Sequence, residues 1–271
     1  MKNFIKIEIE TASSEQGEIL MAEFSENNFY AFEQSETCLT AYIKEEDFDE
    51  ISFKFFLPEN TIYKQSIIED RNWNAEWETQ FHPVRINNFA GIRASFHKPL
   101  EGVKHEIIIT PKMSFGTGHH ATTFLMIELM QAIDFKNKKV LDFGTGTGIL
   151  AILAEKLGAS SVLAIDYDEW SINNATENIQ ANACKHIITE QKHNIHGVSG
   201  VDIILANINL NVLEDNAKEL SRSLVKDSIL LVSGILESDE NSIVSTFFKN
   251  SLVKKQLIQR EGWIALLFKK Q

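Results

Sequence analysis

Val140-Leu141-Asp142-Phe143-Gly144-Thr145-Gly146-Thr147-Gly148 is the stretch that decides the fold. It begins as an apolar run, passes into a loop with three glycines, and is followed by the apolar, helix-forming residues 149–157. This order of strand, glycine loop and helix opens the nucleotide-binding unit of many α/β domains. Glycines are needed in such a loop because it adopts positive φ angles and lets a ligand lie directly on the backbone.

An acidic residue at the end of the next apolar run strengthens this interpretation. Ala164-Ile165-Asp166 places a carboxylate 22 residues after Gly144, at the expected tip of the second strand. An acid at that position accepts hydrogen bonds from a ribose diol. Either feature alone is compatible with structural glycines or a surface acid, whereas the two together in one βαβ series indicate a nucleotide site.

The glycine spacing distinguishes between nucleotides. A dinucleotide-binding fold has the pattern G-x-G-x-x-G beside a pyrophosphate, but here the pattern is G-x-G-x-G, and Asp142 precedes Gly144 by two residues. A carboxylate repels a pyrophosphate and attracts the cationic amino-acid end of S-adenosylmethionine. The loop therefore predicts S-adenosylmethionine as the cofactor, bound at Gly144 and Gly146 with Asp142 beside it.

Apolar strands alternate with helices from Lys138 onward, which is the pattern of a mainly parallel sheet covered on both faces. Strands are expected at residues 139–143, 161–165, 186–190, 202–206 and 228–233, and helices at residues 149–157, 169–183, 212–224 and 239–249. Residues 252–259 and 263–269 lie too close together for a helical crossover, so they are expected to pair antiparallel. The predicted fold class is α/β: a doubly wound, mainly parallel Rossmann-like methyltransferase sheet with an antiparallel C-terminal strand pair.

A small α+β domain is expected in front of this sheet. The alternation of Ile5, Ile7 and Ile9 with charged residues predicts a half-buried strand over residues 3–10. Further strands are expected at residues 29–34, 37–43 and 63–68, and helices at residues 14–27 and 46–56. The predicted domains are residues 1–68, a connecting segment at 69–105 with a short aromatic helix over 73–81, and residues 106–271.

The charge of the chain is negative and concentrated near the N-terminus. The 271 residues carry a net charge of −12, and residues 1–60 contain 14 Asp or Glu against 4 Lys and no Arg. Direct binding of RNA or DNA is not expected, because it requires clustered basic residues. The acidic domain predicts a basic partner, and the alternative is a solvated acidic surface that maintains solubility.

The remaining bulk properties indicate a cytoplasmic protein. Cys38 and Cys184 are the only cysteines, far apart and without metal-ligand spacing, so neither a disulfide framework nor a zinc site is expected. The sequence contains no signal-peptide core and no apolar run of about 18 residues. We expect no membrane association, no metal site and a monomeric chain.

Two further motifs carry candidate chemistry. Asn207 follows the apolar residues 203–206 at the carboxyl end of the expected fourth strand, where open α/β sheets bind ligands. Its carbonyl oxygen could orient an incoming nucleophile, or its side chain could cap the next helix. Upstream, the glycine-rich residues 113–123 include His119 and His120. Adjacent histidines point in different directions, so a metal pair is not expected, while a role as catalytic base stays open.

Residues 115–123, Phe-Gly-Thr-Gly-His-His-Ala-Thr-Thr, resemble the F-G-T-G-x-H-x-T-T signature of the PrmA family, the methyltransferases of ribosomal protein L-eleven. Residues 142–148, Asp166 and residues 206–208 follow in the order of that family, so the resemblance covers most of the chain. By residue, the resemblance implies S-adenosylmethionine contacts at Thr123, Gly144, Asp166 and Asn207, and closure of the site by Thr117.

The resemblance also implies a reaction and a partner. The family methylates lysine side chains and the N-terminal α-amine of one small basic ribosomal protein, and it has a small acidic substrate-recognition domain in front of the catalytic domain. Residues 1–68 are therefore expected to recognise ribosomal protein L-eleven. Because transfer from a sulfonium to an amine depends mostly on positioning, we hypothesise that Asn207 is the catalytic residue that holds the amine in line.

Three other functions are compatible with the sequence. A methyltransferase for another protein, a glutamine amide or RNA would use the same cofactor, but amide and base methyltransferases typically have N-P-P-Y at the fourth strand. Ala206-Asn207-Ile208-Asn209 departs from that pattern after the first Asn. A non-catalytic module would bind S-adenosylmethionine and a protein partner without methyl transfer. A nicotinamide dehydrogenase would bind NAD instead.

Overall fold

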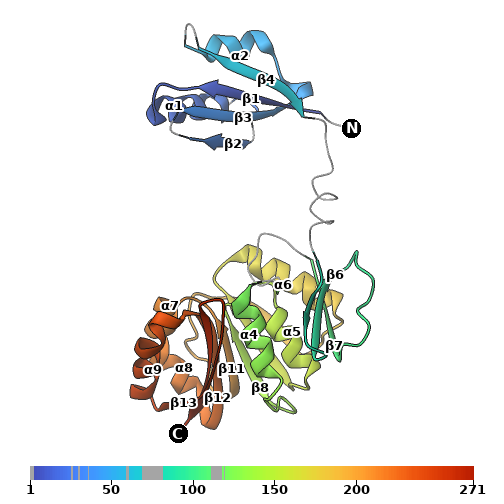
Figure 1. The fold of residues 1–271 in the computed structure, drawn as a ribbon, viewed down its shortest axis with the longest axis vertical. Coiled ribbons are helices and arrows are strands. Elements are labelled where there is room, and N and C mark those ends of the chain that lie inside the picture. The colour runs from blue at the N-terminus through green and yellow to red at the C-terminus, as the bar shows by residue number, and fades with distance from the viewer. Residues whose placement is uncertain are drawn as a thin grey trace. The chain divides into compact units, whose positions relative to one another are not determined.

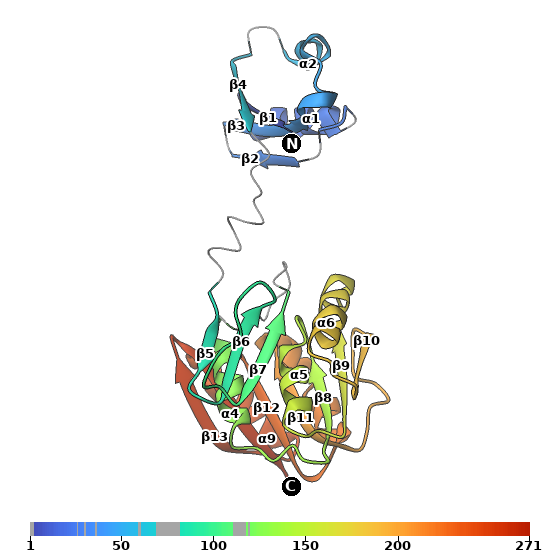
Figure 2. The same cartoon turned by 90° about the vertical axis from the view of Figure 1, so that its right-hand side faces the viewer.

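The computed structural model describes residues 3–25, 27–29, 31–35, 37–58, 61–68, 82–110, 118 and 120–271. The chain divides into two compact units, Met1–Gln80 and Phe81–Gln271. Each unit has its own sheet and its own apolar core (Figures 1 and 2). Within these described residues, no helix is long and apolar enough to cross a membrane.

The N-terminal unit is built on an antiparallel sheet of order β2-β3-β1-β4. Its strands are β1 (Phe4–Glu10), β2 (Ala31–Gln34), β3 (Cys38–Lys44) and β4 (Tyr63–Ile68). Ile5, Ile7 and Ile9 of β1 are buried in one core with Leu20 and Phe24 of helix α1 (Ser14–Ser25). The alternation predicted for the first strand is confirmed.

The second helix of this unit, α2 (Glu50–Phe56), begins later than predicted. Its start is fixed by Asp49, whose carboxylate accepts hydrogen bonds from the backbone N–H groups of Ile51 and Ser52 at 3.3 and 3.1 Å. The preceding residues form a separate 3-10 turn, η1 (Glu45–Asp47). Phe53 of α2 is buried, whereas Ile51 and Phe55 are 82% and 86% exposed.

The second unit contains a seven-stranded sheet of order β10-β9-β8-β11-β12-β14-β13. Its strands are β8 (Lys139–Phe143), β9 (Ser161–Asp166), β10 (Ile187–Gln191), β11 (Val201–Asn207), β12 (Leu224–Leu236), β13 (Leu252–Arg260) and β14 (Trp263–Lys270). Strands β8 to β12 run parallel to one another, and β14 pairs antiparallel with β12 and β13. The predicted doubly wound sheet and its antiparallel C-terminal pair are confirmed.

Helices cover both faces of this sheet (Figure 1). One face carries α4 (Ala121–Met130), α5 (Ile149–Lys156) and α6 (Glu169–Ala181), and the other carries α7 (Leu210–Asp215), α8 (Ala217–Ser223) and α9 (Glu240–Lys249). Each layer buries its own apolar cluster against the strands. Two buried faces explain why the parallel strands are nearly continuous apolar runs in the sequence.

The predicted connecting segment, residues 69–105, extended too far toward the C-terminus. Its later part forms β5 (Val84–Ile86), β6 (Ala90–Ala94) and the start of β7 (His105–Ile109), a three-stranded sheet that belongs to the second unit. The figures show it packed outside α5 and α6 (Figure 2). These strands escaped the sequence analysis because β6 is buried at every position, which removes the alternation typical of a strand. The aromatic helix predicted over 73–81 lies outside the described residues.

The helix predicted over residues 212–224 was also wrong. The structure has two short helices, α7 and α8, that meet at Asn216, whose side-chain amide donates to the carbonyl of Val212 at 2.8 Å. Strand β12 then starts at Leu224, four residues earlier than expected. Asparagine competes with the helical backbone for hydrogen bonds, which explains the break at this position.

Candidate active site

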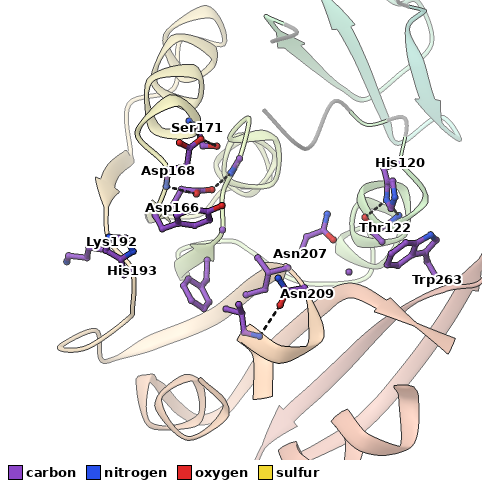
Figure 3. Close-up of a pocket in the computed structure, with 17 residues that line it drawn as sticks. His120, Thr122, Asp166, Asp168, Ser171, Lys192, His193, Asn207, Asn209 and Trp263 are labelled. Carbon is purple, nitrogen blue, oxygen red and sulfur yellow. Dashed lines mark hydrogen bonds between the residues drawn. The ribbon is translucent and has the colours of Figure 1, made fainter. Parts of the chain in front are cut away.

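A cavity of about 700 Å³ lies at the carboxyl ends of β8, β9 and β11 (Figure 3). The strand order reverses beside β8, and this is where doubly wound sheets bind their ligands. Four of the predicted site residues line the cavity: Gly144, Gly146, Asp166 and Asn207. Asp166 lies on one side of the cavity, and Asn207 lies between it and Trp263 on the other side (Figure 3).

The glycine loop is held against the end of β9. The backbone N–H groups of Gly144 and Thr145 both donate to the carbonyl of Ile165, at 2.8 and 3.0 Å. Gly144, Gly146 and Gly148 have φ angles of 76°, 54° and 78°. An added Cβ at Gly144 would overlap Cγ2 of Ile208. The loop therefore needs glycine both for its backbone conformation and for the space on the cavity wall.

Asp166 presents an oriented carboxylate to the cavity. Its Oδ2 accepts a hydrogen bond from the N–H of Gly146 at 2.9 Å, and its Oδ1 accepts one from the N–H of Asp168 at 3.1 Å. A carboxylate has about four lone-pair sites, so two remain for the hydroxyl groups of a ribose. This geometry fits the role expected for an acid at the tip of the second strand.

Asp142, which is expected beside the cofactor, is not among the residues that line the cavity. It is 1% exposed, and its Oδ2 accepts hydrogen bonds from Thr145 Oγ1 at 2.6 Å and from the N–H of Ala151 at 3.2 Å. Its Oδ1 is buried and has no hydrogen-bond partner among the described residues. Desolvation raises the pKa of this carboxyl to about 7, although the hydrogen bonds from Thr145 and Ala151 act to lower it. Asp142 therefore joins the glycine loop to α5.

The raised pKa of Asp142 predicts a pH dependence of stability. Because the folded-state pKa of about 7 lies above the ordinary 3.8, the protonated carboxyl favours the folded state at low pH, and this contribution is lost as the pH rises through 7. Between pH 5 and 8 the wild type is expected to lose on the order of 3 kcal/mol more unfolding free energy than Asp142→Asn. Urea unfolding without cofactor measures this difference, and parallel pH profiles for the two proteins would contradict it.

The structure separates the two roles considered for Asn207. Helix α7 is capped by Asn209, whose Oδ1 accepts a hydrogen bond from the N–H of Val212 at 3.0 Å, so Asn207 is not the cap. Asn207 Nδ2 instead donates to Thr123 Oγ1 at 3.3 Å. Its Oδ1 is buried without a hydrogen-bond partner among the described residues. An acceptor left unpaired at a cavity wall is available to a ligand N–H.

Thr123 and Thr117 are predicted site residues that are not among the described residues lining the cavity. Thr123 is fully buried in α4 behind the cavity wall and reaches the site through Asn207. Thr117 and His119 lie outside the described residues, as do residues 111–116. Among the described residues, no group of three or more His, Cys, Asp or Glu side chains is placed to hold a metal ion.

Part of the cavity wall opposite Asp166 was not predicted from the sequence. Trp263, at the start of β14, lines the cavity and packs edge-on against the ring of His120, with 5.0 Å between the ring centroids (Figure 3). His120 is also the N-cap of α4, where Nδ1 accepts from the N–H of Thr122 at 3.3 Å. The strand pairing that brings Trp263 to this wall joins residues distant in sequence, so no local pattern indicated it.

Gly234 was also missed, although a signal for it was present. It interrupts the apolar strand β12 with a φ of 85°, at an irregularity in the pairing with β14. An added Cβ at Gly234 would overlap the backbone carbonyl of Ile208, with the Ile208 carbonyl carbon at 2.8 Å. A glycine inside a strand often marks a close approach of two backbones. Here that approach positions the segment that follows Asn207.

The site fits S-adenosylmethionine. Its volume of about 700 Å³ lies within the range of cavities that enclose ligands of this size. Asp166 has free acceptor sites for the ribose. Gly144 and Gly146 line the cavity without side chains, and Asn207 lies on the wall beyond them. These residues would hold the cofactor between the glycine loop and the wall formed by Asn207.

The sheet, the glycine loop, the acid at the end of β9 and the antiparallel C-terminal pair define an S-adenosylmethionine-dependent methyltransferase. More specifically, the chain belongs to the family described as ribosomal protein L11 methyltransferase (PrmA), whose model matches residues 5–271. The family resemblance expected from residues 115–123 is thereby confirmed.

Individual relatives agree with this family. The ribosomal protein L11 methyltransferase of Porphyromonas gingivalis is 40% identical over 260 residues, which cover 93% of this chain and 90% of that protein. The protein of the same name from Bacteroides thetaiotaomicron is 38% identical over 260 residues, 93% of each chain. A crystal structure of ribosomal protein L11 methylase from Lactobacillus delbrueckii subsp. bulgaricus has a TM-score of 0.66 and 30% identity, and covers 70% of this chain and 100% of that one.

Proposed function

We propose that this protein transfers methyl groups from S-adenosylmethionine to lysine side chains and the N-terminal amine of ribosomal protein L11. The family membership supports the substrate, since the relatives that match nearly the whole chain are named for it. The observation that carries the chemistry is the buried Asn207 Oδ1, an unpaired acceptor on the wall of the cavity. An amine that enters the cavity would donate an N–H to this oxygen.

Positioning is the main requirement of the reaction. S-adenosylmethionine supplies an activated methyl group, and the neutral amine must approach it in line with the bond that breaks. We assign this alignment to Asn207, with its amide orientation fixed by the hydrogen bond to Thr123. An acceptor in this place orients the lone pair of the amine away from Asn207, toward the cofactor.

The amine must also lose a proton before it can attack. A lysine ammonium has an ordinary pKa of about 10.4, and both desolvation and a neighbouring sulfonium cation lower it. The apolar wall formed by Trp263 and Ile208 supports desolvation of the amine. No strong base is therefore required. His120 has a structural role, since its ring nitrogen caps the start of α4.

We further propose that the acidic N-terminal unit recognises the basic substrate protein through α2. Ile51 and Phe55 lie on its exposed side, one helical turn apart, and are 82% and 86% exposed. Acidic side chains precede and begin this helix: Glu45, Glu46, Asp47, Asp49 and Glu50. Apolar anchors surrounded by charge of one sign suit a partner of the opposite charge with an apolar patch.

Phe55→Ser is expected to raise the KM for ribosomal protein L11 by about tenfold, because a large apolar anchor in a protein interface contributes roughly 1–3 kcal/mol. The kcat at saturating substrate and the Kd of S-adenosylhomocysteine should stay unchanged. Ile19→Ser is the matched control, since Ile19 is a 57% exposed apolar side chain on the other helix of the same unit. Equal KM values for the two variants would contradict the proposed role of α2.

Label transfer distinguishes the proposed function from its alternatives. The purified chain is incubated with methyl-labelled S-adenosylmethionine and dissociated ribosomes, and the protein and RNA fractions are counted separately. Label in the protein fraction supports the proposal, and label in RNA supports the RNA methyltransferase. Binding of S-adenosylhomocysteine without any transfer supports the non-catalytic module. We further propose that the protein is a monomer. We place it in the cytoplasm, where ribosomal proteins are available as substrates.

A further inference from the structure

Two buried asparagines on α6 and a third, half-buried one at its C-cap connect the glycine loop with the edge of β7. Asn174, Asn178 and Asn182 follow one another at intervals of four residues, so their side chains lie on one face of the helix. Asn174 and Asn178 are 1% and 0% exposed. Because buried amides are costly unless they form hydrogen bonds, their partners indicate what this face of α6 does.

Asn182 and Asn178 bind the outer edge of β7. The Oδ1 of Asn182 accepts from the N–H of Ile108 at 3.0 Å, and its Nδ2 donates to the Ile108 carbonyl at 2.6 Å. The Oδ1 of Asn178 accepts from the N–H of Thr110 at 2.7 Å. Four helical residues rise about 6 Å and two strand residues about 6.7 Å, so the two amides match alternate residues of the strand edge.

Asn178 also contacts the cofactor loop. Its Nδ2 donates to the carbonyl of Thr147 at 2.8 Å, between the loop glycines Gly146 and Gly148. Its orientation is set by a second hydrogen bond from Nδ2 to Asn174 Oδ1, at 3.3 Å. The loop is packed directly on α6 here, since an added Cβ at Gly148 would lie 3.2 Å from Ala175 Cβ.

Thr110 is the last residue before the segment 111–119, which contains most of the family signature. One fully buried side chain therefore holds both the loop that contacts the cofactor and the start of the segment that precedes α4. We propose that Asn178 is a positioning residue for methyl transfer, which fixes the cofactor loop and the root of the signature segment relative to each other. A displacement of Thr110 or of the glycine loop then shifts the other, because both form hydrogen bonds with the amide of Asn178.

The test compares Asn178→Asp with Asn182→Ala. Asn178→Asp keeps the acceptor for Thr110 but replaces the donor to Thr147 by an oxygen, so the hydrogen bond between this side chain and the loop carbonyl is lost. It is expected to weaken S-adenosylhomocysteine binding by about tenfold and to lower kcat with ribosomal protein L11 by about tenfold or more. Asn178→Ala, which introduces no buried charge, is expected to change both quantities in the same direction.

Asn182→Ala is the matched control. The substitution removes the two hydrogen bonds between Asn182 and Ile108, which join the end of α6 to the same strand edge that Asn178 binds. Among the described residues, no hydrogen bond of Asn182 reaches the glycine loop. The Tm of Asn182→Ala is also expected to fall, because a similar number of hydrogen bonds is lost, while the Kd and kcat stay within about twofold of the wild type. If the Asn178 and Asn182 variants had equal Kd and kcat values and equal losses of Tm, Asn178 would have only a structural role.

The role of Asn178 rests on the proposed function only where kcat with ribosomal protein L11 is measured. Binding of S-adenosylhomocysteine is measured by calorimetry without a methyl acceptor, so it reports on Asn178 even where the acceptor is in doubt. Failure of the wild type to methylate ribosomal protein L11 would overturn the proposed substrate. An unchanged Kd in both Asn178 variants would overturn the coupling.

Discussion

Asn207→Ala is expected to lower the kcat of methyl transfer by about 100-fold, while the Kd of S-adenosylhomocysteine changes less than about threefold. The substitution removes a buried oxygen on the cavity wall that is free to accept an amine N–H, so the amine is no longer held in line. The backbone of residue 207 stays in the parallel pairing of β11 with β12, so the cavity wall keeps its shape. Single-turnover rates together with calorimetry separate these two quantities.

Asn209→Ala is the control for this substitution. Asn209 caps α7 two residues further along, so its loss should cost about 1 kcal/mol of stability and leave kcat within about threefold of the wild type. If Asn207→Ala retained full turnover and unchanged cofactor affinity, Asn207 would not be the residue that positions the amine.

Gly234→Ala is expected to lower kcat by about 100-fold and the free energy of unfolding by about 3 kcal/mol. The new Cβ would overlap the backbone of Ile208, which has no flexible end that could move aside. The segment that carries Asn207 would have to shift on the cavity wall, and a displacement of about 1 Å is sufficient for a loss of this size.

Gly102→Ala distinguishes this overlap from backbone strain. Gly102 has a φ of 75°, close to the 85° of Gly234, but no atom lies within 4 Å of its added Cβ. It is therefore expected to cost about 1 kcal/mol and to leave kcat unchanged. Chemical denaturation and steady-state kinetics of both variants give the comparison, and similar kcat losses in Gly102→Ala and Gly234→Ala would contradict the close-approach argument.

The sheet of the second unit could be predicted because its signals are local. Most of the parallel strands contain an apolar run closed by a glycine or a polar residue, and the glycine loop and Asp166 follow at fixed spacing. The same locality placed Gly144, Gly146, Asp166 and Asn207 on one edge of the sheet, since the carboxyl ends of parallel strands meet there.

The parts that were wrong or missed depend on contacts between distant residues. The orientation of Asp142 is an exception, because Thr145 and Ala151, which hold its carboxylate beneath the loop, are close to it in sequence. The sheet of β5, β6 and β7 depends on the amides of α6, 68 to 74 residues away. Trp263 reaches the cavity only through the pairing of β14 with β12.

Methyl transfer is tested most directly by the mass of ribosomal protein L11 after incubation with the 271-residue chain and S-adenosylmethionine. We predict mass increases in steps of one methyl group, located by peptide mapping at lysine side chains and at the N-terminal amine. With Asn207→Ala the same increases should appear about 100-fold more slowly. Unmodified ribosomal protein L11, under conditions where the chain binds S-adenosylhomocysteine, would contradict the account.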